Sequence, residues 1–423
     1  MTIGGNSADV ALRDRAAKVL PGGMYGHLSA RLLPEGYPQF FAHGAGAELW
    51  DVDGNRYIDF MCAYGPNLFG YADPEIDAAY TAQLREGDTL TGPSPLIVEL
   101  AEAMTSQVAH AEWAVFCKNG TDATTAAVMA ARAATRKRTL LRARGAYHGA
   151  APWCTPRDAG VAPGDRANQI LYDYNDVASL EAAVQAAGDD LAAIIASPIG
   201  QPAFAPQTLP TPEYARAARD LATRAGAMLI VDEVRTGYRT TTGSVWDTLG
   251  AAPDMSAWGK VLANGHPLSA LLGGPAARKG AEKIYVTGSF WFSAAPMAAA
   301  LVVQKRVREG AYLTHIKAIG AALRTGLAER ADRHGVGFAQ TGPETMPLFL
   351  FDDDADFRAG FFWGSQMLRR GVYVHPWHNM FINAAMTEAH IERTLAAADE
   401  AFAALAAAQA SLPPNAILAA PAG

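Results

Sequence analysis

Short apolar runs that alternate with helical patterns constrain this chain more than any other feature of its sequence. They begin at about residue 74 and recur with helical stretches between them. Continuous apolar strands separated by helices are typical of a buried, mostly parallel sheet, because helices cover both of its faces. The sequence therefore predicts an α/β fold with a mostly parallel sheet flanked by helices. The expected strands are Trp113–Cys117, Thr139–Arg142, Ala192–Ala196, Met228–Val231 and Ala270–Leu272.

The two ends of the chain have a different pattern and are expected to pack together as a smaller α+β domain. Asp53-Gly54-Asn55 lies between two apolar runs within Glu48–Phe60, which predicts a hairpin. We expect an N-terminal segment at residues 1–72, a large domain at 73–310 and a C-terminal domain at 311–423, whose tail from Ser411 is loosely held. Further expected elements are helices over Asn6–Leu20, Ala311–His334 and Glu388–Ala408, with strands near Pro347–Phe351 and Val372–His375.

Composition excludes several classes of protein. Hydrophobic residues make up 50% of the 423 residues and charged residues 18%, which is typical of a packed globular chain of two to three domains. The net charge of -7 does not fit a nucleic-acid partner. We find neither a signal peptide nor an apolar run of ~20 residues, so we expect a cytoplasmic protein without a membrane partner. Cys62, Cys117 and Cys154 lack CxxC spacing, so we expect reduced thiols and no metal site.

A carboxylate pair follows one of the apolar runs. Met228–Val231 leads directly into Asp232 and Glu233. Ligands of open α/β sheets bind at the carboxyl ends of the strands. A carboxylate there can keep a pyridine nitrogen protonated through a charge-assisted hydrogen bond. On its own, the pair would also suit a helix N-cap after a strand.

A lysine stands one αβ unit further along the chain. Lys260 lies 28 residues after Asp232, between Gly259 and an apolar run. Burial would lower the pKa of its amine and make it a usable nucleophile. An isolated lysine is usually a surface residue. The spacing of Lys260 from Asp232 is therefore what makes this lysine a candidate nucleophile.

Two turns complete the pattern. Asn119-Gly120-Thr121 follows the first expected strand and precedes a helical stretch, where backbone N–H groups and the helix dipole bind phosphate. Tyr147 and His148 lie between Gly145 and Gly149 after the second expected strand. An aromatic residue in such a turn can lie flat on a planar ring, or it can simply cover the core.

Taken in this order on one α/β domain, these motifs resemble those of the class III (ω-amino acid:pyruvate type) aminotransferases. These are fold-type I enzymes that use pyridoxal 5'-phosphate (PLP), and the likeness extends from about Pro21 to Leu405. Within the family, the glutamate-1-semialdehyde aminomutase-like branch is the most similar. The resemblance implies transfer of an amino group from a primary amine or an ω-/β-amino acid to a keto acid or aldehyde. It also implies pyridoxamine phosphate as the second cofactor form and a homodimer with shared active sites.

The resemblance implies roles for individual residues. Lys260 would carry PLP as a Schiff base, Asp232 would pair with the pyridine nitrogen, and Tyr147 would stack on the ring; these three are the expected catalytic residues. A hydroxyl group from the neighbouring subunit would reach the phosphate, with Ser289 favoured over Thr287. The remaining expected cofactor-binding residues are Asn119, Gly120 and Thr121 at the phosphate, His148 beside Tyr147, and Val234 on the other ring face.

Three departures from the family pattern put the aminomutase reaction in doubt. The Ser-Pro-Val-Arg stretch is replaced by Met24–Ser29, Asn-Pro by Ala295-Pro296, and Ala-His-Thr by Ala385-Met386-Thr387. An aromatic and imidazole-rich set would suit a bulky or apolar amine, although its members also fit core or interface positions. The expected substrate-binding residues are Tyr25, His27, Trp153, Trp377 and His378. No arginine is assigned to a substrate carboxylate; Arg31, Arg142, Arg144, Arg235 and Arg239 all stay open.

Other activities share the same motifs. A 1,2-aminomutase or an amino-acid racemase or epimerase would use the same lysine and cofactor, and a requirement for a second carbonyl substrate would separate them from a transaminase. A non-catalytic PLP-fold binding protein is disfavoured by the intact Lys260 and Asp232. An NAD enzyme is disfavoured because no GxGxxG follows the first expected strand.

Overall fold

The computed structural model describes residues 5–419 and divides the chain into two compact units. One unit is the continuous stretch Pro74–Leu313, and the other combines Met1–Asp73 with Thr314–Gly423. We refer to them as the central unit and the terminal unit. The outermost parts of the predicted N- and C-terminal segments, residues 1–4 and 420–423, lie outside the described residues.

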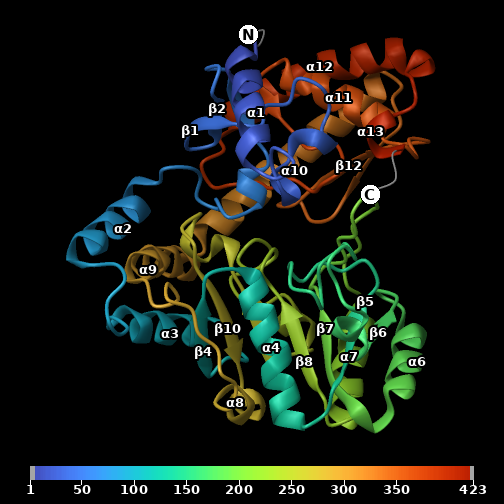
Figure 1. The fold of residues 1–423 in the computed structure, drawn as a ribbon. Coiled ribbons are helices and arrows are strands. Elements are labelled where there is room, and N and C mark those ends of the chain that lie inside the picture. The colour runs from blue at the N-terminus through green and yellow to red at the C-terminus, as the bar shows by residue number, and fades with distance from the viewer. Residues whose placement is uncertain (1–4, 420–423) are drawn as a thin grey trace. The chain divides into compact units, whose positions relative to one another are not determined.

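The central unit is built on a seven-stranded sheet with the order β4-β10-β9-β8-β7-β5-β6 (Figure 1). Neighbouring strands are parallel from β9 through β6, whereas β10 is antiparallel to both β4 and β9. The strands β4, β9, β8, β7, β5 and β6 therefore run in the same direction. Their bounds are β4 Trp113–Cys117, β5 Thr139–Ala143, β6 Gln169–Tyr172, β7 Leu191–Ala196, β8 Met228–Asp232, β9 Met255–Trp258 and β10 Ser269–Gly273.

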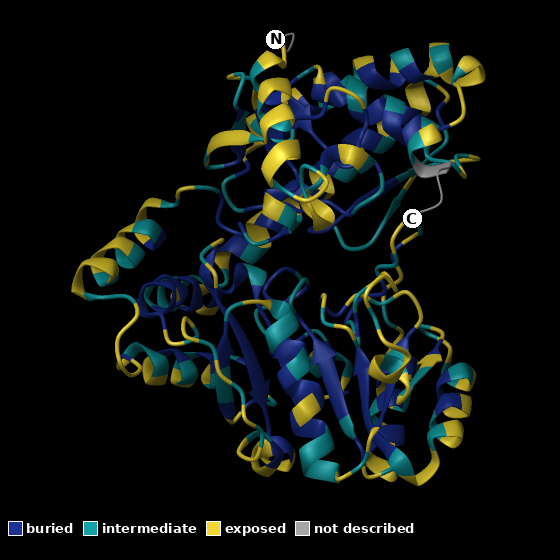
Figure 2. Ribbon diagram, in the orientation of Figure 1, coloured by how far each residue is buried: buried dark blue, intermediate teal, exposed yellow. Residues whose placement is uncertain are grey.

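Alternate residues of the strands face two separate apolar cores. Leu141, Ile194 and Leu229 belong to the core formed with helices α6 and α7, whereas Leu140 and Ile230 belong to the core formed with α4 and α8. Because strand side chains alternate between faces, the two cores lie on opposite sides of the sheet. Figure 2 shows the strands buried along most of their length and exposed residues on the outer sides of the helices. The helices are α4 Gly120–Thr135, α6 Val177–Ala187, α7 Pro212–Arg224 and α8 Pro275–Ala281.

The remaining α-helices of the central unit lie near the β4 end of the sheet or in a connection. Helix α9 packs against α2 and α3, and α3 contacts the edge strand β4. Short 3-10 turns also occur, and two of them, Trp246–Leu249 and Lys260–Ala263, follow strands β8 and β9. The bounds are α2 Pro74–Glu86, α3 Leu96–Gln107, α5 Pro163–Arg166 and α9 Ala294–Glu309.

The terminal unit contains a four-stranded sheet, β1-β2-β3-β13, and a hairpin of β11 and β12. Asp51 accepts hydrogen bonds from Asn55 and Tyr57, which closes the predicted β2–β3 turn. Strand β13 from the C-terminal segment pairs in parallel with β3 from the N-terminal segment, so the two ends of the chain build one sheet. The elements are α1 Ser7–Val19, β1 Phe41–Ala45, β2 Glu48–Asp51, β3 Arg56–Asp59, α10 Ala311–Arg333 from the unit boundary onward, β11 Phe338–Thr341, β12 Leu348–Phe351, α11 Arg358–Leu368, β13 Val372–Tyr373, α12 Glu388–Ala408 and α13 Ala416–Ala419.

The predicted α/β class with a mostly parallel sheet is confirmed, with one correction of strand direction. The run Ala270–Leu272 is a buried strand as expected, but it pairs antiparallel with both neighbours. An apolar run is equally buried in either direction, so the sequence pattern alone does not distinguish them. Two strands of this sheet were not foreseen: β6 at the edge is half-buried, and β9 is short and contains Ser256. In the terminal unit, β11 was not foreseen either.

Candidate active site

Four strands bring the expected cofactor residues to one edge of the central sheet. Strands β4, β5, β8 and β9 run in the same direction, so their carboxyl ends meet there. Asp232 is the last residue of β8, and Lys260 follows β9 after a single glycine. The Asn119 turn follows β4, and Tyr147 and His148 follow β5. Open α/β sheets bind ligands at this edge.

The N-terminus of α4 offers donors for an anion. Asn119 caps the helix: its side chain accepts from the Asp122 N–H, and the Asp122 carboxylate accepts from the Asn119 N–H. Gly120 and Thr121 are the first two residues of this 16-residue helix. The first N–H groups of a helix have no intrahelical acceptor, and the dipole adds positive potential there. The Asp122 carboxylate is therefore used in the cap.

Thr121 also presents a hydroxyl group beside these amides. Its oxygen accepts from the Ala150 N–H at 3.1 Å, which leaves the hydroxyl hydrogen to donate elsewhere. Gly149, at φ +123°, lets the chain pass close to this hydroxyl, since a Cβ there would lie 2.5 Å from the Thr121 oxygen. Gly120 in turn lies against Val234, because a Cβ on Gly120 would be 2.8 Å from the valine Cγ1. Close approach by the backbone therefore shapes this end of the site.

Asp232 and His148 form a buried pair. The imidazole Nδ1 lies 2.7 Å from the Asp232 carboxylate, and the histidine side chain is fully buried. The other carboxylate oxygen accepts from the Val234 N–H at 3.1 Å. The histidine Nε2 is buried without a hydrogen-bond partner among the described residues. The Trp153 indole lies parallel to the imidazole with the ring centroids 6.5 Å apart, and it donates to the Thr125 hydroxyl; its expected part in substrate binding stays a prediction.

Lys260 is held in an unusual backbone conformation and has a perturbed amine. Its φ is +48°, a left-handed conformation that costs a non-glycine residue roughly 1–3 kcal/mol. Burial, together with the nearby Arg235 and Arg239 guanidinium groups, lowers its pKa from 10.5 to about 7, although Asp232 acts in the opposite direction. At neutral pH a large fraction of this amine is therefore unprotonated, as a nucleophile or proton acceptor requires.

Tyr147 differs from its neighbours in being accessible. It is 47% exposed, and partial burial raises the pKa of its phenol above the ordinary value. Asp232 and Arg235 both influence this phenol electrostatically, which places its side chain near the strand-end carboxylate. An aromatic ring with an open face is suited to cover a planar ligand.

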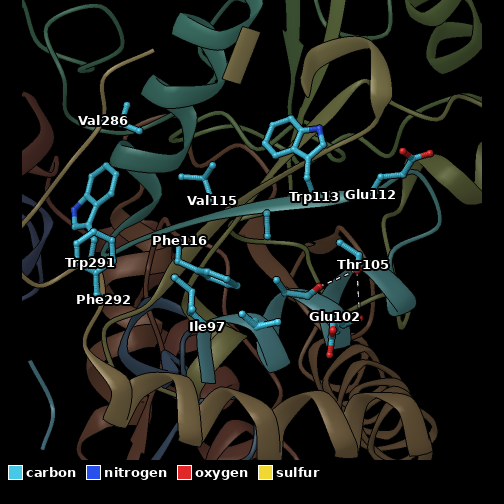
Figure 3. Close-up of a pocket in the computed structure, with 13 residues that line it drawn as sticks. Ile97, Glu102, Thr105, Glu112, Trp113, Val115, Phe116, Val286, Trp291 and Phe292 are labelled. Carbon is cyan, nitrogen blue, oxygen red and sulfur yellow. Dashed lines mark hydrogen bonds between the residues drawn. The ribbon is translucent and has the colours of Figure 1, made fainter. Parts of the chain in front are cut away.

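The segment before α9 carries Thr287 and Ser289, and both are exposed. Gly288 and Trp291 close a turn around Ser289, with the Trp291 N–H donating to the Gly288 carbonyl at 2.9 Å. Beside this turn, a groove of about 490 Å³ runs between α3, β4 and the 286–292 segment. Figure 3 shows Trp291 and Phe292 at one end of the groove and Glu112 toward the other, with Phe116 and Ile97 between them.

The other expected substrate residues lie in the terminal unit, where several of them form a cluster. The Tyr64 ring lies 4.6 Å from His27 and 5.5 Å from His378, and Trp377 packs edge-on against His375. Burial lowers the pKa of His375 to about 3, so this imidazole is neutral. Tyr25 is 63% exposed. The part of these residues in substrate binding stays a prediction.

Tyr64 and His375 were not foreseen in this cluster. Cys62, Ala63 and Tyr64 all have positive φ values, a strained run that sequence patterns do not reveal. The carboxylate of Asp59 accepts from the Met61 and Cys62 N–H groups and holds this turn. The imidazole-rich sequence from His375 to His378 was a visible signal, but only its second half was singled out.

The candidate arginines separate into two groups. Arg144 is paired with Asp173, Arg142 donates to the Ala146 carbonyl, and Arg31 donates to Ser29. Arg235 and Arg239 are the two that influence Lys260. The assignment of a substrate carboxylate to any of the five stays open.

Between residues 5 and 419, no group of His, Cys, Asp and Glu side chains is placed to hold a metal ion. In the same part of the chain, no helix combines the length and the apolar character that crossing a membrane requires.

The residues at the sheet edge fit PLP. The α4 N-terminus and the Thr121 hydroxyl suit a phosphate, and the buried Asp232–His148 pair suits a protonated ring nitrogen. The Lys260 amine suits an aldehyde carbon. The chain would hold PLP through these groups.

The perturbed amine gives a testable expectation for the protein without cofactor. Acylation of Lys260, followed by peptide mass spectrometry across a pH series, should show a midpoint near pH 7. In Arg235→Met the midpoint should move upward, because a positive neighbour that disfavours the charged amine is gone. Arg216→Met, on the exposed face of α7, is the matched control and should leave the midpoint unchanged. An equal midpoint in Arg235→Met and the wild type would contradict this account.

Comparison with known proteins identifies the family. The model of the family described as "Aminotransferase class-III" matches residues 34–340. An aminopentol aminotransferase of Sphingopyxis macrogoltabida is 53% identical over 407 residues, which cover 96% of each chain. A glutamate-1-semialdehyde 2,1-aminomutase of Rhodopirellula baltica is 32% identical and covers 92% of this chain and 95% of its own.

A solved structure agrees with this relationship. It is described as the PLP internal aldimine form of the Sphingopyxis sp. MTA144 FumI protein, and it is 52% identical in sequence. It superimposes with a TM-score of 0.96 over 97% of this chain and 99% of its own. The fold is therefore that of the fold-type I PLP transferases, and PLP is the cofactor. The chain belongs to the class III aminotransferases.

Proposed function

We propose that this aminotransferase takes the amino group of a primary amine without a neighbouring carboxylate, of the amino-alcohol class, and passes it to a keto acid or an aldehyde. One observation carries the chemistry: a buried lysine with a lowered pKa, a buried carboxylate–imidazole pair and a helix N-terminus lie at one sheet edge. The donor class rests on the similarity to the aminopentol aminotransferase, whose substrate name gives an amine and hydroxyl groups.

Each residue has a defined task in this proposal. When bound, PLP supplies an aldehyde carbon and a ring that withdraws electrons from the substrate carbon bearing nitrogen. Lys260 would hold the aldehyde carbon, and its free amine would accept the proton of that substrate carbon and return it. Asp232 keeps the ring nitrogen protonated, and His148 orients Asp232. Tyr147 and Val234 would cover the two faces of the ring, and Gly120 and Thr121 would bind the phosphate.

The aminomutase alternative receives less support. The aminomutases among the relatives are 31–32% identical, well below the 53% of the aminopentol aminotransferase. The three departures from the branch pattern, at Met24–Ser29, Ala295-Pro296 and Ala385–Thr387, point the same way. Among the solved structures, an aminomutase at 21% identity shares the fold and carries no further argument.

The proposal is tested by following the visible absorbance of the cofactor-loaded protein. An amino alcohol added without any carbonyl compound should bleach this absorbance, and a keto acid added afterwards should restore it. Amino alcohols should react faster than α-amino acids, and Lys260→Ala should show neither step. A protein that turns over only carboxylate-bearing donors would overturn the donor class. Turnover of one substrate without any acceptor would instead favour an aminomutase or a racemase.

The Thr121 hydroxyl provides a test of the phosphate site. Thr121→Val keeps the shape of the side chain but removes a donor to a charged group, a bond worth roughly 1.5–3 kcal/mol. The Kd for PLP should therefore rise roughly 10- to 100-fold, as measured by titration of the protein without cofactor. Thr135→Val, at the other end of α4, loses a hydroxyl that donates to the Ala131 carbonyl and accepts from the Lys137 N–H, and it serves as the control. Equal Kd values in the two variants would remove Thr121 from the phosphate site.

The same proposal includes a homodimer in which Ser289 of one chain reaches the phosphate held by the other. Ser289 is exposed, as a residue that reaches a second chain must be. The adjoining groove is lined by apolar side chains such as Trp291 and Phe116, which favours cover by another protein surface. A second copy is its proposed occupant, because the turn that carries Ser289 continues into the groove. The expected cytoplasmic location stays a prediction.

Mixed dimers test the shared site. Lys260→Ala and Ser289→Ala chains, unfolded together and refolded, should form hybrid dimers with one intact site and one doubly altered site. A fraction with wild-type PLP affinity should then appear that neither variant shows alone. If Ser289 serves its own chain, the mixture should behave as the sum of its parts. A monomeric mass in solution would also sink the proposal, and Thr287→Ala tests the second choice of residue.

A further inference from the structure

A chain of hydrogen bonds lies within the central unit, between the end of α3 and strand β9. His110 Nδ1 lies 3.1 Å from both carboxylate oxygens of Asp247, and its Nε2 lies 2.8 Å from Ser256 Oγ. The Trp258 indole N–H donates to the same Ser256 oxygen at 2.7 Å. Ser256 and Trp258 are buried, and the His110 side chain is 3% exposed. We call these four residues the His110 network.

One assignment of donors and acceptors satisfies every bond in the network. An indole N–H only donates and an ionised carboxylate only accepts. Ser256 thus accepts from Trp258 and passes its own hydrogen to His110 Nε2, while His110 Nδ1–H donates to Asp247. A neutral imidazole with its proton on Nδ1 satisfies all of these bonds at once. Exchanging any one of these side chains for an apolar one would leave a buried polar group unsatisfied.

The network contains the residue types of a serine hydrolase triad, but a substrate has no access to its serine. Ser256 lies inside strand β9 with no exposed surface, and its oxygen already accepts from Trp258. No substrate carbonyl can approach this hydroxyl. The effect of the network must therefore pass through the protein itself.

Trp258 connects the His110 network to the active site. It directly precedes Gly259 and Lys260. Its indole also supports the turn after β8: a Cβ on Gly237 would lie 2.6 Å from the Trp258 ring, and Tyr238 packs on that ring at 4.8 Å. This turn begins immediately after Asp232. One side chain thus contacts the turn next to the catalytic carboxylate and is joined directly to the segment of the lysine.

The His110 network is also linked to the turn after β8 through Glu233 and the residues that precede Asp247. Glu233, next to Asp232, accepts from Thr236, Ser244 and the Val245 N–H. Residues 244–245 lead into the 3-10 turn that carries Asp247. Burial raises the pKa of Glu233 to about 7. Polar contacts therefore connect the segment around Asp232 with the segment around Lys260: Glu233 binds the loop that leads to Asp247, and the His110 network links Asp247 to Trp258.

We propose that His110 is a positioning residue: through Ser256 it fixes the Trp258 indole, and thereby the position of Lys260 relative to Asp232. The strained backbone of Lys260, at φ +48°, needs such support, because a left-handed conformation persists only where its surroundings hold it. This inference rests on the proposed catalytic role of Lys260.

The test compares His110→Phe, which keeps a planar ring but no hydrogen bonds, with Tyr172→Phe. The control loses a buried hydrogen bond to Tyr214 in the same unit, within the core formed with α6 and α7. In the protein without cofactor, His110→Phe should move the Lys260 acylation midpoint from about 7 toward its ordinary value, since a displaced amine is better hydrated. Tyr172→Phe should lower the melting temperature and leave this midpoint unchanged.

Kinetics of the cofactor-loaded enzyme give a second measurement. His110→Phe should lower kcat roughly 10- to 100-fold with little change in the KM for the donor, because a displaced lysine impairs the proton step more than binding. His110→Gln keeps an acceptor for Ser256 and should recover part of both effects, and it replaces His110→Phe if that variant does not fold. Ser256→Ala should add little to His110→Phe, because both interrupt the same chain.

The outcomes separate this inference from the proposed function. If His110→Phe and Tyr172→Phe both leave the Lys260 midpoint and kcat at wild-type values, the network is structural only and the inference fails. If Lys260→Ala still transaminates, the proposed role of Lys260 fails, whereas the acylation midpoint still reports whether His110 positions that side chain.

Discussion

The contact between Asp232 and His148 is the interaction on which the arrangement of this site depends. A carboxylate at the end of a buried strand is costly unless it is paired and hydrogen-bonded. His148 supplies the pair at 2.7 Å, and the Val234 N–H satisfies the other oxygen. Both partners belong to backbone segments that leave the same sheet edge, after β5 and β8. The pair therefore joins two loops and fixes a negative charge where a ring nitrogen would need one.

That negative charge also balances the positive groups around Lys260. Arg235 and Arg239 both disfavour the protonated amine, whereas Asp232 favours it. Burial is the largest influence, so the net effect is an amine with a pKa of about 7. A lysine needs burial to be unprotonated near neutral pH, but it also needs a nearby carboxylate to tolerate its protonated form during proton transfer. The sheet edge provides both within a few residues of β8 and β9.

Sequence patterns predicted the helices and strands whose formation depends on the periodicity of neighbouring residues. The strands at residues 113–117 and 228–232 follow from continuous apolar runs, and α12 follows from its helical periodicity. The direction of β10 did not follow, because an apolar run is buried in either orientation. Lys260 and Asp232 were recognisable from their residue types and their spacing along the chain, but the αβ unit expected between them was wrong: in this fully described stretch, β8 and β9 are joined by a loop with the 3-10 turn Trp246–Leu249 and no α-helix. The His110 network was not recognisable, because residues 110, 247 and 256 meet only through the packing of α3, the loop after β8 and β9.

The network also shows why residue types alone do not define a chemistry. Ser256, His110 and Asp247 are bonded in the order that activates a nucleophile in hydrolases. Two facts remove that function here: the serine has no exposed surface, and its oxygen already accepts from Trp258. What remains is the rigidity of a fully satisfied buried chain, in which every donor has one acceptor. A polar chain of this kind specifies a single position for Trp258. Because Lys260 follows only two residues later, its position is fixed as well.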